Sequence, residues 1–236
     1  MLALQETKTI NDLFPREAFA KAGYIHQAIH GQKGYHGVAI VSRLPFREQK
    51  ATQFCGKNDC RHMSVTLENG IELHNFYVPA GGDIPDPAVN EKFAHKLAFL
   101  GEMRALFEAR KTDRKKKLVL VGDLNVAPLE NDVWSHKQLL KIVSHTPVET
   151  ELLTAAKDAF DWIDVAREFV PPSEKIFSWW SYRNNDWRVS DRGRRLDHVW
   201  TSQGLKGAVT SHKILKDARD WTQPSDHVPV VVEIAD

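Results

Sequence analysis

The clearest sign of chemistry in this sequence lies where an apolar run meets a carboxylate and a carboxamide. Residues 118–121, Leu-Val-Leu-Val, are followed by Gly122, Asp123, Leu124 and Asn125. Asp123 and Asn125 are two positions apart, so their side chains share one side of the backbone while it stays extended. Such a strand end is typical of a functional site. An Asp/Asn turn that hydrogen-bonds its own backbone explains the segment equally well.

Five more polar residues stand at the edges of apolar runs. Glu6 follows Leu-Ala-Leu-Gln, and Tyr77 stands in Phe-Tyr-Val-Pro. Asp197 lies in Leu-Asp-His-Val-Trp, and Asp226-His227 comes directly before Val-Pro-Val-Val-Val. Taken singly, each has a structural explanation, such as a helix first-turn acid or a turn. Together they offer carboxylates that suit Mg²⁺ and a histidine that can carry charge near phosphate, which favours metal-dependent phosphate ester hydrolysis.

Composition limits the class of protein. The chain has 236 residues, of which 27% are charged and 42% hydrophobic, and its net charge is +1. These values are typical of one globular domain, and no apolar run reaches the roughly 20 residues of a membrane span. The N-terminus lacks the basic and apolar parts of a secretory signal. Cys55 and Cys60 cannot build a disulfide framework and are interpreted as structural thiols. We expect a cytoplasmic, monomeric single domain over residues 1–236, without membrane contact.

The charge is unevenly distributed along the chain. Residues 110–117 are strongly basic and are interpreted as a solvated connection between a helix and a strand. A second group of arginines interleaves with aromatic residues, namely Arg183, Arg188, Arg192, Arg194 and Arg195 with Trp179, Trp180, Tyr182 and Trp187. Arginines beside aromatics suit phosphates together with bases or sugars, although core packing explains at least one of each adjacent aromatic pair.

The elements that must position these residues alternate between strands and helices. Strand-like runs cover residues 37–42, 62–67, 71–78, 118–121, 195–201, 207–215 and 228–234. The spacing of apolar residues predicts a helix from Asn90 to Ala109, with Asn90 as its cap. Residues 148–169 predict one or two shorter helices that end before Pro171-Pro172. Clustered strands with helices outside them predict an α/β or α+β layered sandwich.

In their order along the chain, these motifs resemble the exonuclease III/AP endonuclease family, within the wider endonuclease/exonuclease/phosphatase group that includes DNase I. The resemblance runs from residue 2 to about residue 234 through LQETK, GVAIVSR, YVPAGG, GDLNVAP, FSWWSYR, RRLDHVW and SDHVPV. It implies a DNase I-like four-layered sandwich of two packed mixed β-sheets flanked by helices. It also implies a metal-dependent DNA phosphodiester hydrolase, a 3′→5′ exodeoxyribonuclease and apurinic/apyrimidinic endonuclease of base excision repair. Its cofactor would be Mg²⁺, or Mn²⁺, and its partner double-stranded DNA at abasic sites and 3′ ends.

The resemblance implies a catalytic role for five residues. Asp123 matches the aspartate that orients or deprotonates the attacking water, and Asn125 beside it would steady the phosphate or that water. His227 matches the histidine that contacts the scissile phosphate, and Asp197 the aspartate that orients it. Tyr77 matches the tyrosine on the leaving-group side.

Metal and substrate residues are implied in the same way. Glu6 matches the metal-ligand glutamate, and Asp226 the aspartate near the metal. Trp179 falls where the family has an aromatic wall of the abasic-sugar pocket. Arg194 and Leu196 lie in the segment that forms the opposite lip.

The sequence departs from the family in two places. Ala80 stands where the family usually has Asn or Gln, so a phosphate-contacting amide is absent or replaced, for example by the Gly81-Gly82 backbone. The family also begins with a strand and a helix before its LQETK strand, whereas this chain starts inside that strand. We expect Met1 to be an internal or misassigned start, and the missing strand to leave unpaired backbone and an apolar slot. Two alternatives stay open: a same-fold phosphohydrolase of small phosphodiesters, and a truncated, non-catalytic DNA-binding remnant.

Overall fold

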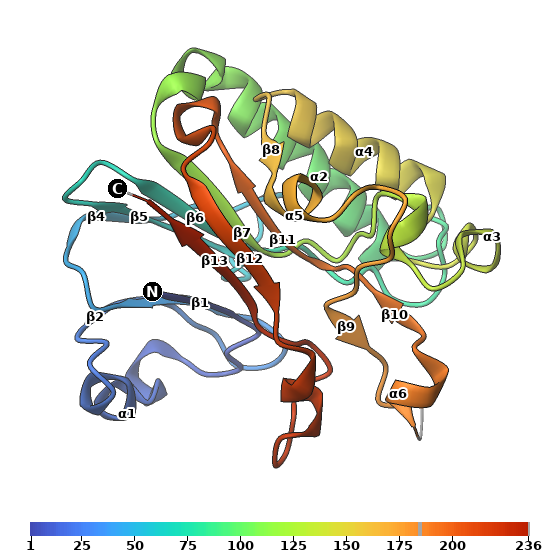
Figure 1. Cartoon of the computed structure of the whole chain (residues 1–236), viewed down its shortest axis with the longest axis horizontal. Coiled ribbons are helices and arrows are strands. Elements are labelled where there is room, and N and C mark those ends of the chain that lie inside the picture. Colours follow the sequence, from blue (N-terminus) through green and yellow to red (C-terminus); the bar gives the residue numbers. More distant parts are fainter. Residues whose placement is uncertain (184–185, 236) are drawn as a thin grey trace.

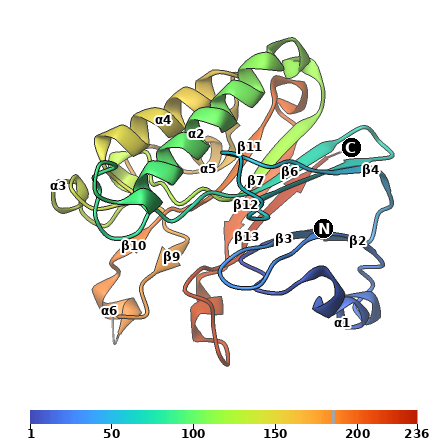
Figure 2. The same ribbon diagram turned by 180° about the vertical axis from the view of Figure 1, so that it is seen from behind.

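Residues 1–183 and 186–235 are described by the computed structural model, in which the elements stack in four layers (Figure 1). Helices α2 (Glu91–Ala109) and α4 (Pro147–Asp158) cover one face of a six-stranded sheet. Smaller sheets pack on the other face, and the short helix α1 (Arg16–Lys21) lies beyond them, as Figure 2 shows from behind. This is the predicted sandwich of two sheet layers between helices.

The central six-stranded sheet is mixed. Its order is β4-β5-β6-β7-β11-β8, and the pair β6–β7 is parallel while the other four pairs are antiparallel. The strands are β4 (Phe46–Ala51), β5 (His62–Leu67), β6 (Glu72–Tyr77), β7 (Leu118–Asp123), β8 (Ile163–Asp164) and β11 (Asp197–Thr201). β7 reads as an apolar run because both faces of the sheet are covered there. On one face, Leu118 and Leu120 pack with Phe99 and Met103 of α2.

The second sheet layer consists of two antiparallel pieces. One has the order β1-β3-β2, with β1 (Leu2–Gln5), β2 (His26–His30) and β3 (Val38–Ser42). The other is the pair β12 (Val209–Ile214) and β13 (Val230–Ile234). Every strand pair in the described part of this layer is antiparallel, whereas the central sheet is mixed. Within the described chain β1 and β13 each pair with one strand.

The remaining elements are short. They are α3 (His136–Leu139), α5 (Val165–Phe169), α6 (Trp187–Ser190), β9 (Trp179–Trp180) and β10 (Gly193–Arg194). The long helix was predicted correctly to within one residue: Asn90 is its N-cap, and its side chain accepts a hydrogen bond from the Lys92 amide. Residues 148–169 do contain two helices, α4 and α5, with β8 between them. The basic run 110–117 is an exposed connection, as predicted, in which only Arg110 and Asp113 are partly buried.

Gly122 fixes how closely β6 and β7 approach. Its φ is 142°, and a Cβ atom built there would lie 1.9 Å from the carbonyl oxygen of Phe76. Only glycine fits this position, because any side chain would collide with the neighbouring backbone. The close approach places the last residue of β7, Asp123, next to the last residue of β6, Tyr77.

Two properties bear on the class of protein. In the described part of the chain no helix combines the length and apolar character needed to cross a membrane. Cys55 and Cys60 are both free thiols, and Cys60 is buried.

Candidate active site

Four predicted catalytic side chains converge at one edge of the central sheet. In the strand register, Asp123 on β7 stands opposite both Tyr77 on β6 and Asp197 on β11. The backbone of His227 forms an isolated bridge with that of Trp179, which brings the histidine to the same edge. Residues that lie as far apart in the sequence as Tyr77 and His227 are therefore close together in the fold.

Asn125 and Asp123 form a turn that is also part of the site. Asn125 has φ 52° and is 9% exposed. Its backbone N–H donates to Asp123 Oδ1 at 3.0 Å, and its Nδ2 donates to Asp123 Oδ2 at 2.9 Å. Nδ2 also donates to the Val78 carbonyl at 2.9 Å. The Asx turn that competed with a functional interpretation thus holds the Asp123 carboxylate in place.

His227 is oriented by a hydrogen-bonded row. Its Nδ1 donates to Asp197 Oδ2 at 2.8 Å, and its Nε2 lies 3.8 Å from Asp123 Oδ2. Ser178, which the sequence patterns did not identify, donates from Oγ to the same Asp197 oxygen at 2.6 Å. Its hydroxyl oxygen also accepts from the N–H groups of Leu196 and Asp197. A serine directly before the predicted pocket tryptophan was the available signal.

The charges in this cluster shift each other's protonation. Burial alone would lower the pKa of His227, but the negative charges of Asp197 and Asp123 raise it to about 10. Burial raises the pKa of Asp123 to about 7; the His227 cation opposes this rise, and Asp197 adds to it. Burial, together with the charges of Asp123 and Glu6, also raises the pKa of Tyr77. The cluster therefore contains a cationic histidine beside acids that are crowded together.

The donors present suit a hard divalent cation. Asp123, Asp197 and His227 each offer a ligand atom within 4.8 Å of the others. Glu6 follows β1, and its closest ion-pair partner is Lys8, at 3.4 Å, so its one-third exposed carboxylate remains accessible. Asp226 Oδ2 accepts a hydrogen bond from Trp179 Nε1 at 2.9 Å. Carboxylate oxygens predominate in this set, as Mg²⁺ requires, and a cation would relieve the crowding of negative charge.

The predicted pocket residues lie around Trp179. Arg194 pairs with Trp179 in the β9–β10 register, and its guanidinium carbon is 5.2 Å from the Trp179 ring centroid. The same guanidinium donates to the Ser144 hydroxyl at 2.7 Å. Leu196 is only 4% exposed and packs in the cluster with Ala127 and Trp179. The structure therefore places Leu196 behind the tryptophan, where it supports the pocket through packing.

The aromatic and arginine-rich segment forms an arm of β9, α6 and β10 that projects from the sandwich beside the segment leading from β12 to β13 (Figures 1 and 2). The two are tied together, because Trp187 Nε1 donates to Asp220 and the Tyr182 hydroxyl donates to the Pro224 carbonyl. Arg188 is also paired with Asp220. Arg195 is buried between Asp132 and Asp164, so it is structural.

Residue 80, in the loop after β6, is an alanine, so its side chain cannot supply the amide that the family usually has there. Gly81 and Gly82 follow it with φ of 91° and 70°. The Gly81 carbonyl accepts from Asn90 Nδ2, and the Ala80 carbonyl accepts from Lys96 Nζ. This loop is thereby anchored to the start of α2.

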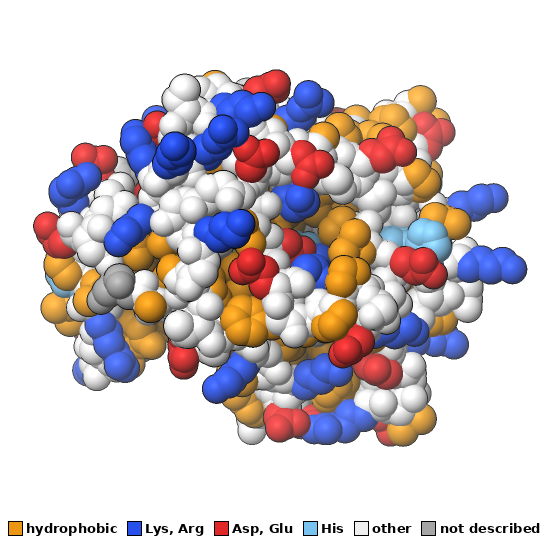
Figure 3. All heavy atoms as spheres, turned by 45° about the horizontal axis from the view of Figure 1, so that its top comes forward, with side chains coloured by type: hydrophobic (Ala, Val, Ile, Leu, Met, Phe, Trp, Pro, Cys, Tyr) orange, Lys and Arg blue, Asp and Glu red, His pale blue; other side chains and the backbone are white. Residues whose placement is uncertain are grey.

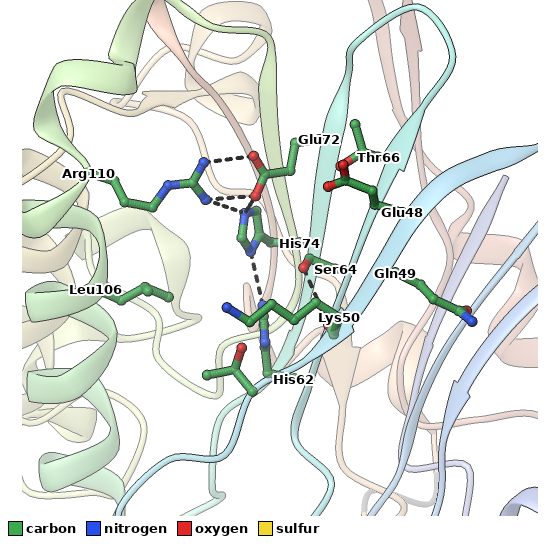
Figure 4. Close-up of a pocket in the computed structure, with 11 residues that line it drawn as sticks. Glu48, Gln49, Lys50, His62, Ser64, Thr66, Glu72, His74, Leu106 and Arg110 are labelled. Atoms are coloured by element: carbon green, nitrogen blue, oxygen red, sulfur yellow. Dashed lines mark hydrogen bonds and ion pairs between the residues drawn. The ribbon is translucent and has the colours of Figure 1, made fainter.

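A cavity elsewhere shares no lining residue with the cluster. It has a volume of about 340 Å³ and lies between β4, β5, β6 and α2 (Figure 4). His62 and His74 face each other there at 3.0 Å, and Arg110 clamps both oxygens of Glu72. Burial lowers the pKa of both histidines. This row joins the end of α2 to the sheet, so we interpret it as structural. This cavity is therefore separate from the candidate cluster.

The helix-bearing face gives no simple electrostatic signal. Figure 3 shows basic and acidic side chains interspersed over the described part of this face. That distribution agrees with the net charge of +1. On this face, recognition of a polyanion must therefore depend on local groups.

Comparison with known proteins places this geometry in a family. A model of the endonuclease/exonuclease/phosphatase family matches residues 1–227. The chain is 29% identical to exodeoxyribonuclease III of Haemophilus influenzae, over 99% of this chain and 89% of that protein. Its fold is similar to that of an AP endonuclease from Archaeoglobus fulgidus, with a TM-score of 0.89 and 28% identity, covering 99% of this chain and 88% of the other. A 3′ phosphatase from Neisseria bound to product DNA hairpin is similar too, with a TM-score of 0.88, 28% identity and the same coverage. Because that family model matches residues 1–227, the chain belongs to the endonuclease/exonuclease/phosphatase family.

Proposed function

We propose that this protein is a metal-dependent DNA phosphodiester hydrolase that acts as a 3′→5′ exonuclease and cleaves beside abasic sites in DNA repair. The observation that carries the proposal is the convergence of Asp123, Asn125, Asp197 and His227 at one sheet edge, next to Trp179. The similarity to exodeoxyribonuclease III and to an AP endonuclease supports the same activity.

The role of each residue in this proposal follows from its charge and its hydrogen-bond partners. Asp123, held by Asn125, positions and deprotonates the attacking water. His227, kept cationic and oriented by Asp197, stabilises negative charge on the phosphate oxygens. Tyr77 stands on the opposite side of Asp123 from Asp197, where it donates a hydrogen bond toward the leaving group.

Glu6 and Asp226 would hold Mg²⁺, with Mn²⁺ as a substitute. When bound, the cation polarises the phosphate and stabilises the departing oxygen. Glu6 raises the pKa of Tyr77 by its charge, which supports a position on the Tyr77 side of the site.

DNA is the substrate class that the surroundings of the site favour. Trp179 supplies an aromatic wall, and Arg194 supplies a cation fixed over its ring. An extruded abasic sugar would enter this pocket, with the neighbouring phosphates near the arginines of the arm. The relative solved with a product DNA hairpin supports DNA as a partner. A monomeric state and a cytoplasmic location stay predictions.

The proposal is tested by comparing substrates at equal concentration in Mg²⁺ and in EDTA. A duplex with one abasic site, a duplex with a recessed 3′ end and bis(p-nitrophenyl) phosphate separate the possible activities. We expect Mg²⁺-dependent cleavage of both duplexes and far slower turnover of the small diester. Preferred turnover of the small diester would favour the first alternative. Duplex binding without cleavage would favour a non-catalytic DNA-binding protein.

A further inference from the structure

A buried ion pair lies directly behind the catalytic loop. Lys96 of α2 and Glu149 of α4 form this pair, and neither side chain has any exposed surface. Burying two charges is unfavourable unless further hydrogen bonds satisfy them. The hydrogen-bond partners of Lys96 and Glu149 therefore indicate which segments the ion pair connects.

The ammonium group of Lys96 is bonded to the two loops that leave the ends of β6 and β7. Its Nζ donates to the Asn125 carbonyl at 2.7 Å and to the Ala80 carbonyl at 3.3 Å. Asn125 has a left-handed backbone, which a non-glycine residue keeps only when its surroundings favour it. Lys96 bonds the carbonyl of that residue, so it stabilises the conformation that presents the Asn125 side chain to Asp123.

The carboxylate of Glu149 holds a different segment. It accepts hydrogen bonds from the Ser144 amide at 2.9 and 3.0 Å, and from the amide and hydroxyl of Thr146. The Ser144 hydroxyl in turn accepts from Arg194, the cation over Trp179. One ion pair is thus connected to the water-positioning loop on one side and to the proposed pocket on the other.

We propose that Lys96 and Glu149 are positioning residues, which set the Asn125 loop and Arg194 in fixed relation to each other without touching the substrate. The inference rests on the proposed function, because it gives Asn125 and Arg194 their roles there. A purely structural pair would affect folding stability alone. The positioning role predicts defects in turnover and substrate binding that persist when stability is restored.

The first experiment uses the double variant Lys96→Met/Glu149→Gln. Lys96→Met alone leaves an unpaired buried carboxylate and should be destabilised, whereas the double variant removes both charges and should recover most of that stability. Urea unfolding and steady-state kinetics on the abasic duplex are measured for both. We expect the double variant to keep a kcat at least about tenfold below wild type. A wild-type kcat in the stable double variant would overturn the proposal.

The second experiment distinguishes the effect of Lys96 from that of Glu149. In Glu149→Gln, Lys96 still bonds Asn125, so KM should rise through Arg194 while kcat falls less than in Lys96→Met. Equal changes of kcat and KM in the two single variants would indicate one shared structural effect and contradict the proposal. Lys92→Met, an exposed lysine on the same helix, is the matched control.

Hydrogen exchange supplies a measurement that does not need catalysis. Amides of residues 122–128 should exchange at least about tenfold faster in Lys96→Met than in Lys92→Met, because the loop has lost its anchor. Unchanged exchange would overturn the positioning role. If the wild-type protein cleaves no phosphodiester, the proposed function fails, while exchange still decides whether Lys96 fixes this loop.

Discussion

At the scale of single residues, the proposed catalytic cluster depends on how Asp197 holds His227. One oxygen of the Asp197 carboxylate accepts from the His227 ring and from Ser178, so it joins three segments that are distant in sequence. The histidine is cationic because of that carboxylate and Asp123, despite burial that works in the opposite direction. The Asp197 carboxylate therefore contributes to both the positive charge and the orientation of His227.

Replacing Asp197 by asparagine should change the pH dependence of the reaction. His227 must be protonated to stabilise the phosphate, and its raised pKa keeps it so up to about pH 10. Without the Asp197 charge the pKa of His227 falls. The loss of activity at alkaline pH should therefore begin at a lower pH than in the wild type. We expect kcat to fall by about 10²–10³ as well. A pH–rate profile measures both effects, and an unmoved alkaline limb would contradict the role of Asp197.

Ser178→Ala should cost stability. The change leaves the amides of Leu196 and Asp197 without their hydroxyl acceptor and Asp197 without a donor. Leaving buried polar groups unsatisfied typically costs about 1–3 kcal/mol each, so we expect a loss of that order in the free energy of unfolding. Urea denaturation measures it. Ser181→Ala, in the neighbouring arm, serves as a control, and a loss no greater than in that control would count against the arrangement.

At the scale of elements, the parallel contact between β6 and β7 aligns the site. Gly122→Ala would place a methyl group against the Phe76 carbonyl, in a backbone conformation that alanine avoids. We expect a destabilisation of several kcal/mol, measured by urea unfolding. The matched control is Gly101→Ala in α2, where a Cβ meets nothing within 4 Å. That variant should gain about 0.5–1 kcal/mol, because alanine favours the helix. Equal stability of the two variants would contradict the packing described.

Apolar patterning predicted those elements that have at least one strongly buried face. The run at 118–121 and the long helix at 90–109 were identified because each meets the core. β4 was missed, since Arg47, Glu48, Gln49 and Lys50 make it an exposed edge strand without an apolar pattern. β8 was missed because two residues are too few to show a period.

The site was predictable only in part, for a similar reason. Motifs identified Asp123, Asp197 and His227, whose residue types already suggest chemistry. Ser178 and Lys96 act through hydrogen bonds to groups that are distant in sequence, at separations of 19 and 29 residues. Only the folded chain brings such partners together.

At the scale of the whole molecule, Mg²⁺ should stabilise the folded protein. A ligand that binds only the folded state at 100 times its Kd raises the free energy of unfolding by about 2.7 kcal/mol. We expect a rise of this order, detected by thermal unfolding at increasing Mg²⁺, and its loss after EDTA. Glu6→Gln should show a smaller rise, because one carboxylate is gone. The same rise in wild type and Glu6→Gln would contradict the assignment of Glu6.

We expect the edge where β6, β7 and β11 meet to hydrolyse DNA phosphodiesters, with Asp123 as the water-positioning carboxylate. The most direct test is Mg²⁺-dependent incision of an abasic duplex by wild type and Asp123→Asn, with Asp158→Asn on the exposed surface of α4 as control. Asparagine keeps the size of the side chain but cannot accept the proton of the attacking water. The predicted result is robust incision by wild type and Asp158→Asn, and a rate at least about 10²–10³ lower in Asp123→Asn. Incision by Asp123→Asn at the rate of the control would show that Asp123 does not position the attacking water.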